Sequence, residues 1–164
     1  MMPTRPDPQA LLDALAGRYE RWHWSPGLTA EVVGAAIGIP LAPQPTHVGA
    51  RTLHSTVAHI PTQPYAVRFR WDDDGELALV ELAAPPATPD WATVLAALGD
   101  PDVVHPHGRG PLPGSDQLCF LTRGLTVFDG AGLGYQAVWL YPPTTAQEYA
   151  ERTAAFQTPT RMRR

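Results

Sequence analysis

His105 and His107, separated by one residue, have the spacing in this sequence that is most suggestive of metal chemistry. In an extended segment, residues i and i+2 point to the same side, so both imidazoles can bind one ion. A third ligand would have to come from Asp102, His54 or His59. Because the sequence has no His-Glu-x-x-His motif and no paired cysteines, a solvated loop is the simpler explanation of the histidine pair.

Four carboxylates surround a single glycine, Gly75, in the segment formed by Asp72, Asp73, Asp74 and Glu76. Paired carboxylates perform acid–base catalysis only when a pocket separates their pKa values, and a hairpin tip does not provide one. A calcium loop would need a regular alternation of ligands that this segment lacks. The pattern therefore predicts either a solvated turn or an acidic knob that contacts arginine or lysine side chains of a partner.

The sequence offers no convincing nucleophile. Cys119 is the single cysteine and lies in an apolar run, which is typical of a buried structural thiol. Ser115 lacks the Gly-x-Ser-x-Gly elbow, and the glycine-rich segment 130–134 lies between two expected strands, not before a helix. We therefore expect no catalytic residue and no cofactor.

Length, composition and charge make several classes of function unexpected. The chain has 164 residues, of which 44% are hydrophobic, and its net charge is −4. This length and composition predict a single folded domain that spans residues 1–164. The only concentration of positive charge is the tail with Arg161, Arg163 and Arg164, so nucleic-acid binding is not expected. The N-terminal residues lack the apolar core of a secretion signal, and no apolar run reaches the roughly 18 residues of a membrane span. We expect a cytoplasmic protein that does not enter a membrane.

The first half of the chain contains two helix patterns and three strand patterns. An amphipathic helix is predicted over about 8–24, with its apolar periodicity running to Trp22. A second helix starts at Thr29 and ends before Pro40. One edge strand is expected near 51–59, and the alternating segments 65–71 and 76–83 predict a β-hairpin around the acidic turn.

The second half repeats this plan. Asp90 is the expected N-cap of a short helix that ends at Gly99, and a loop follows to about 115. The pattern predicts one long strand over 117–128, broken or bulged at Gly124, and a returning strand over 135–141. Thr145 has capping-box spacing to a glutamate and opens a terminal helix over about 145–157.

The two halves align as internal repeats over about 28–86 and 89–143. A shift of 61 residues superposes Thr29 on Asp90, and Gly38 on Gly99, so N-caps and glycine stops coincide. The predicted fold is α+β: two α-β-β repeats form an antiparallel sheet covered by helices on one face, with an extra helix at each terminus.

The pattern Leu-Thr-x-Glu-x-Val followed by Gly-Ile-Pro, here from Leu28 to Pro40, resembles the small outer-membrane-assembly lipoproteins and their tandem relatives, the β-lactamase inhibitory proteins. The resemblance covers about 28–143. The chain differs from both families, since it lacks their secretion signal, lipidated cysteine and paired cysteines. The resemblance implies a protein-binding sheet surface and no catalysis.

Aromatic residues near the end of the second repeat are the other candidates for partner binding. Trp139, with Tyr135 and Tyr141, could line the sheet face opposite Val138 and Leu140, and these residue types are enriched at interface hot spots. Alternatively, the terminal helix could cover that face and place all three rings in the core.

The leading hypothesis is a non-enzymatic protein-binding module, most concretely an immunity or inhibitor protein that neutralises a bacterial toxin, such as a basic enzyme. Its predicted contacts are the acidic turn and the aromatic strand, and its acidic groups would speed capture of a cationic partner. The alternative is a small metal-dependent or small-molecule enzyme that uses His105 and His107. A further alternative is an assembly subunit of a larger complex.

Overall fold

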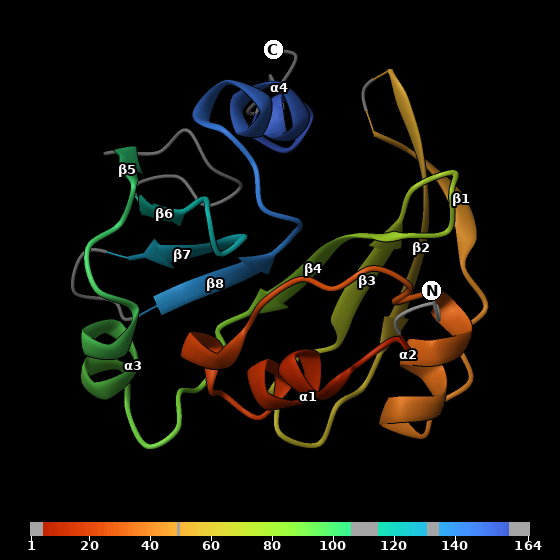
Figure 1. The fold of residues 1–164 in the computed structure, drawn as a ribbon, viewed down its shortest axis with the longest axis horizontal. Helices are drawn as coiled ribbons and strands as arrows, with labels where there is room; N and C mark the ends of the chain where they lie inside the picture. Colours follow the sequence, from red (N-terminus) through yellow and green to blue (C-terminus); the bar gives the residue numbers. More distant parts are fainter. Residues whose placement is uncertain (1–4, 49, 106–114, 131–134, 158–164) are drawn as a thin grey trace, which may run out of the picture.

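A computed structural model describes residues 5–48, 50–105, 115–130 and 135–157, and it shows an α+β protein built on one antiparallel sheet (Figure 1). Within these residues the sheet has eight strands in the order β1-β2-β3-β4-β8-β7-β6-β5. The strands are β1 Gln44–Val48, β2 Arg51–Ala58, β3 Val67–Trp71, β4 Leu77–Ala83, β5 Val103–His105, β6 Asp116–Phe120, β7 Leu125–Asp129 and β8 Tyr135–Leu140. The helical elements are α1 Gln9–Leu15, the 3-10 helix η1 Tyr19–Arg21, α2 Ala30–Ile37, α3 Trp91–Leu98 and α4 Ala146–Gln157.

The strand order is symmetric about the centre of the sheet. The last strand of each half, β4 and β8, pair with each other, and earlier strands follow outward on both sides. Each of the helices α2 and α3 is therefore followed by four strands, not by the two of the predicted α-β-β unit. β1 and β5 lie in segments predicted as loops and form the two edges of the sheet, where Pro45 is tolerated. The strand predicted near 51–59 is confirmed as β2, but it is not an edge strand, because β1 pairs along its outer side.

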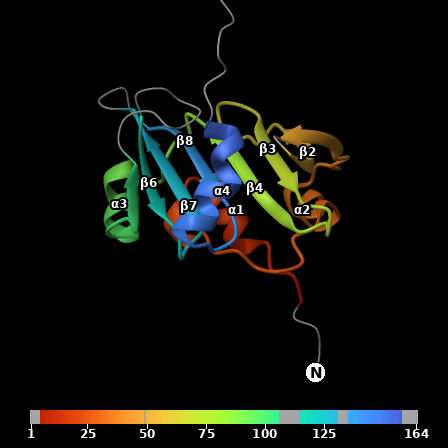
Figure 2. The ribbon, with the colours of Figure 1, turned by 90° about the horizontal axis from the view of Figure 1, so that it is seen from above.

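Helices cover both faces of the sheet, which corrects the prediction that they cover only one. α1, η1, α2 and α3 pack on one face, here called the inner face, and α4 lies on the opposite, outer face (Figures 1 and 2). The inner core contains the large rings of Tyr19, Trp22, Phe69 and Trp71, all of them buried. A smaller outer core forms under α4 around Trp139.

The predicted helix caps of the repeats are confirmed. The backbone N–H of Val32 donates to Thr29 Oγ1 at 3.3 Å, and that of Thr93 donates to Asp90 Oδ1 at 2.7 Å. These bonds occupy helix N–H groups that have no partner within the helix. α2 ends at Gly38, whose left-handed φ of +72° suits a residue without a Cβ.

The first helix is shorter than the prediction of 8–24. α1 ends at Leu15, and the chain then turns at Gly17 with φ +91° before η1. The end of α1 is closed locally, because Gly17 lies in the left-handed region, its N–H donates to the Ala14 carbonyl and the next N–H donates to the Asp13 carbonyl. Tertiary contacts add to this stop: the Leu15 carbonyl accepts from Gln63 Nε2 at 3.1 Å, and the Ala16 carbonyl accepts from Thr88 Oγ1 at 2.9 Å.

The segment 117–128 forms two strands instead of one. β6 and β7 pair with each other through a turn that ends at Gly124, whose φ is +78°. The Gly124 N–H donates to the Phe120 carbonyl, and its own carbonyl accepts from the backbone N–H of Tyr141 and from Trp22 Nε1, both at 2.9 Å. A Cβ at Gly124 would overlap the Tyr141 carbonyl oxygen, so this turn depends on glycine.

No helix among the described residues combines the length and the apolar character that crossing a membrane requires.

Candidate partner-binding surface

The outer face of the sheet has a covered half, formed by β6, β7 and β8 beneath α4 (Figure 2). Tyr149 of α4 packs there against a cluster that includes Trp139, Tyr141, Phe128 and Cys119. Trp139 is 2% exposed and Tyr141 is 8% exposed. The sequence allowed these rings to lie either on an exposed sheet face or in the core beneath the terminal helix. Trp139 and Tyr141 lie in the core, because α4 covers them. A partner could contact them only if α4 moved away.

The hydroxyl groups of Thr126, Tyr141 and Tyr149 form a buried hydrogen-bond network inside this covered half. Thr126 Oγ1 donates to Tyr149 Oη at 3.0 Å, and Tyr149 Oη donates to Gln117 Oε1 at 3.2 Å. Since Thr126 has one hydroxyl proton, Tyr141 Oη must be the donor in its 2.8 Å bond to Thr126. Burial raises the pKa of both phenols, so the chain is neutral at physiological pH.

Cys119 lies beside this chain and is buried, as its apolar sequence context predicts. Burial raises the pKa of its thiol, which keeps the sulfur protonated and poorly nucleophilic.

Tyr135 lies apart from the other two aromatic candidates. Its ring contacts Trp91 of α3 on the inner side of the sheet, with 4.3 Å between ring centroids. Strict alternation would place it with Trp139, but the β7–β8 register shifts between Phe128 and Asp129. This irregularity separates Tyr135 from Trp139, and the sequence pattern gives no sign of it.

The other half of the outer face is formed by β1–β4, and we call it the open face. It carries several polar and exposed side chains. On this side of the sheet Arg70 Nε donates to Glu81 Oε2 at 3.0 Å, while Arg68 and Val57 are exposed. Val57, at 55% exposure, is one of the few large apolar side chains open to solvent in the described residues. Shallow depressions run along this face from Gln44 to the edge of the covered half.

The four carboxylates of the acidic turn between β3 and β4 fall into two groups: two accept hydrogen bonds that hold the structure, and two are exposed. Asp72 Oδ1 accepts from the N–H groups of Asp74 and Glu76 and so closes the turn. The Glu76 carboxylate accepts from the N–H of Gly27 at 2.9 Å and ties the turn to the segment before α2. Asp73, with a side chain 80% exposed, lies 3.4 Å from His54, and Asp74 is also exposed.

The candidate metal ligands do not converge in the described residues. His105 is in β5 at one edge of the sheet and stacks on Tyr149, whereas His54 is in β2 beside the opposite edge. Asp102 accepts a hydrogen bond from the N–H of Thr122 at 3.2 Å. No group of three or more possible metal-binding side chains occurs in the part of the chain that the structure describes. His107 lies outside the described residues, as do 131–134 of the glycine-rich segment and the arginine tail.

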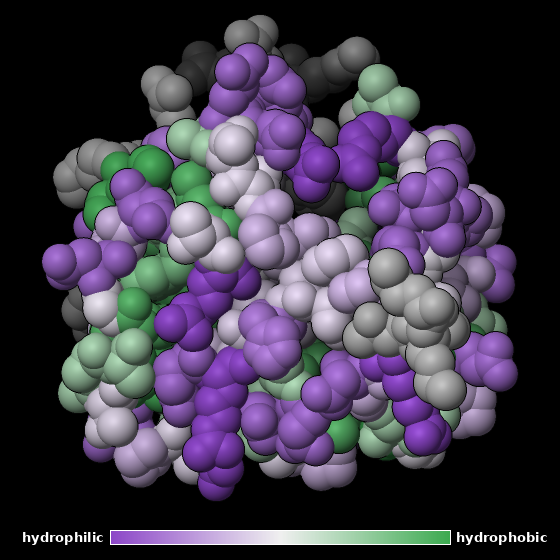
Figure 3. Space-filling model, in the orientation of Figure 1, coloured by the Kyte–Doolittle hydropathy of each residue, from purple (hydrophilic) through white to green (hydrophobic). Residues whose placement is uncertain are grey.

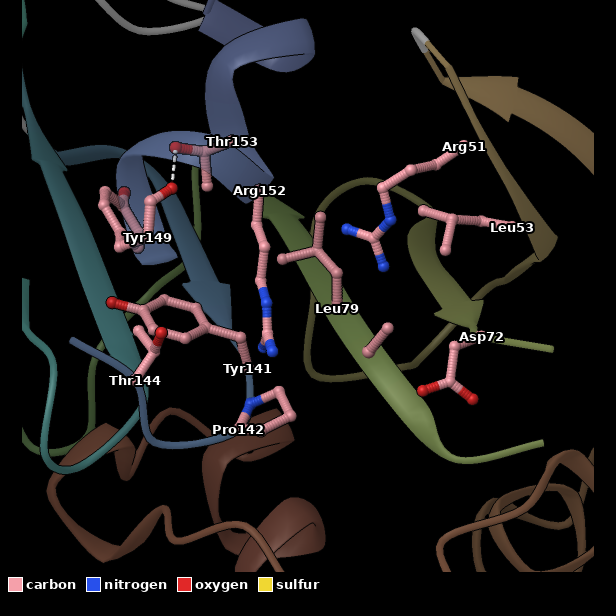
Figure 4. A pocket seen from close by; sticks show the side chains of 11 residues that line it. Arg51, Leu53, Asp72, Leu79, Tyr141, Pro142, Thr144, Tyr149, Arg152 and Thr153 are labelled. Atoms are coloured by element: carbon pink, nitrogen blue, oxygen red, sulfur yellow. Dashed lines mark hydrogen bonds between the residues drawn. The ribbon is translucent and has the colours of Figure 1, made fainter. Parts of the chain in front are cut away.

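A hollow of about 140 Å³ lies where the covered half meets the open face, and we call it the junction hollow (Figure 3). Its floor is formed by Leu79 and Tyr141, and Leu53 lies on the side of β2. Figure 4 shows Arg51 entering from β2 and Arg152 entering from α4. Neither arginine was singled out from the sequence, because they are 101 positions apart and only tertiary packing brings them to one hollow.

The chain matches no protein-family model, and searches of curated proteins and of solved structures find no significant match either.

Proposed function

We propose that the protein is a non-enzymatic protein-binding module that engages its partner through the open face. The observation that carries this proposal is the unequal cover of the outer face: α4 buries β6–β8 together with Leu79 of β4, whereas Val57 and Arg68 remain exposed on β2 and β3. An exposed apolar side chain, Val57, lies there among charged groups, and interfaces commonly combine an apolar centre with a polar rim.

The exposed carboxylates of the acidic turn support a partner with a positively charged patch. Asp73 and Asp74 are exposed at this turn and can steer a basic protein toward the sheet, whereas Asp72 and Glu76 hold the turn in shape. An immunity or inhibitor protein that neutralises a basic toxin in the cytoplasm is the most concrete form of this function. A subunit of a larger complex would use the same surface.

The shared plan of the two halves supports an origin by tandem duplication. In each half a capped helix precedes four strands, and the two sets of strands are ordered as mirror images from the centre of the sheet. Only the half without α4 over it then serves as the binding surface.

Affinity purification of the tagged chain from its native host, with mass spectrometry of the bound proteins, tests this function. The baits are the wild type, a double variant Val57→Asp with Arg68→Glu, and the control Arg18→Glu, an exposed arginine outside the open face. We expect a near-stoichiometric partner with the wild type and the control, and its loss with the double variant. Recovery of the same partner with the double variant, or of no partner with any bait, would overturn the proposal.

A further inference from the structure

The two arginines of the junction hollow reach it from opposite walls. Arg51 comes from β2 in the first half of the chain and Arg152 from α4, and both side chains extend over the floor formed by Leu79 and Tyr141 (Figure 4). Two guanidinium groups that share one hollow repel each other, and a bound anion would remove that repulsion.

The carboxylates near the hollow, in the part of the chain that the structure describes, form no ion pair with Arg51 and only a weak one with Arg152. Among the described residues, Arg51 has neither an ion pair nor a side-chain hydrogen bond. Arg152 lies 4.0 Å from Glu148, but both side chains are more than half exposed, and such a pair is weak. Asp72 lines the hollow, yet one of its oxygens is held by two N–H groups of its own turn.

The shape of the hollow favours a side chain over a free ion. Leu53 at the side and Leu79 at the floor provide apolar surface that a short aliphatic stem can contact, while the arginines lie where a terminal carboxylate would be. The hollow also borders the open face, so a protein lying on that face would present its side chains to it.

We propose that the junction hollow is a receptor for an aspartate or glutamate side chain of the partner protein, held between Arg51 and Arg152. This inference rests on the proposed function and adds a requirement to it. The partner must carry an acidic side chain close to the basic patch that faces Asp73 and Asp74. A uniformly basic protein would bind less well, because it would place a positive charge against the two arginines of the hollow.

The test uses the full chain and a capped peptide of alternating glutamate and leucine, with the same peptide containing glutamine as the uncharged probe. Binding is followed by NMR through the arginine Nε–H signals. We expect the glutamate peptide to bind at least about fivefold more tightly than the glutamine peptide, with affinity that falls as salt rises. The Arg51→Gln and Arg152→Gln variants should each weaken binding at least about threefold, and Arg18→Gln should not.

Equal binding of the two peptides, or unchanged affinity in both hollow variants, would overturn the carboxylate receptor. These arginines are exposed, and circular dichroism of each variant checks that its fold is retained. The outcome is separate from that of the proposed function. A partner that still depends on Val57 and Arg68, but binds the hollow variants normally, would leave the open face as the binding surface without this receptor.

Discussion

On the outer face of the sheet, β6–β8 and Leu79 of β4 are buried beneath α4, whereas Val57 of β2 and Arg68 of β3 are exposed. The strands of the two halves differ accordingly in the side chains they present. The covered half contributes Cys119, Thr126 and Phe128, which are uncharged and buried. The open half contributes Arg68 and the Arg70–Glu81 ion pair.

This difference shows how one helix decides whether a sheet face becomes part of the core or remains available for binding. Where Tyr149 closes the face, the hydroxyls of Thr126, Tyr141 and Tyr149 bond one another and Gln117 Oε1, because burial separates them from solvent. Outside this cover, Arg68 and Val57 remain exposed to solvent and to partners. Stability is therefore expected to depend mainly on the covered half, and binding mainly on the open half.

The largest expected effect is at the turn of the covered half. Gly124→Ala places a Cβ against the Tyr141 carbonyl and disfavours the left-handed backbone, so we expect a loss of at least about 3 kcal/mol in unfolding free energy. Urea unfolding measures it. The matched control is Gly75→Ala in the open half, where φ is +79° but a Cβ meets nothing within 4 Å, and the loss should be about 1 kcal/mol. Equal losses would contradict the close approach at Gly124.

Removal of the ring that closes the covered half should have the next largest effect. Tyr149→Ala leaves a cavity under α4 and removes the partner of Thr126 and Gln117, so we expect a loss of about 3–4 kcal/mol. Tyr149→Phe keeps the ring and should cost about 1–2 kcal/mol for the hydroxyl alone. Calorimetry of both variants separates the two contributions, and two equal losses would show that packing of the ring adds nothing.

The buried phenols predict a loss of stability at high pH. Burial raises the pKa of Tyr19 to about 12, while the same phenol in the unfolded chain ionises near 10. Above pH 10 the unfolded state therefore binds fewer protons than the folded state, and stability falls as pH rises, by roughly 2–3 kcal/mol at pH 12 from Tyr19 alone. Tyr141 and Tyr149 of the covered half act in the same direction. In urea unfolding at pH 7 to 11.5, Tyr149→Phe should lose less stability than the wild type, and an identical slope would contradict this role.

The smallest effect on stability is expected on the open face. Val57→Ser and Arg68→Ala remove exposed side chains, so each should change the unfolding free energy by no more than about 0.5 kcal/mol. Thermal unfolding of each variant tests this. A loss comparable with that of Tyr149→Phe would show that the open face is part of the core and not a surface kept for a partner.

Local chemistry made several elements predictable. The N-caps Thr29 and Asp90 satisfy helix N–H groups within three residues, and the alternation around the acidic turn defines the β3–β4 hairpin. The buried state of Cys119 also follows from its apolar neighbours. In these cases the partners that stabilise the structure lie within a few positions along the chain, so a sequence pattern contains the whole interaction.

Apolar periodicity overran two points that glycines mark. α1 stops at Leu15, where Gly17 closes the helix through local backbone bonds, and Gln63 and Thr88 then bond the Leu15 and Ala16 carbonyls. The 117–128 segment turns back at Gly124, where the sequence predicted a break or bulge, and Tyr141 packs on that turn. Periodicity reports only the spacing of apolar residues, so by itself it extends a helix or strand past the glycine that ends it.

Neighbouring residues specify the α+β class, the capped helices of the two halves and the acidic hairpin, so patterns in the chain predict all three. Packing between distant segments places α4 over the outer face of β6–β8, separates Tyr135 from Trp139, and brings Arg51 and Arg152 to one hollow. Alternation along a strand assigns a side chain to a face. What covers that face depends on packing between segments far apart in the chain.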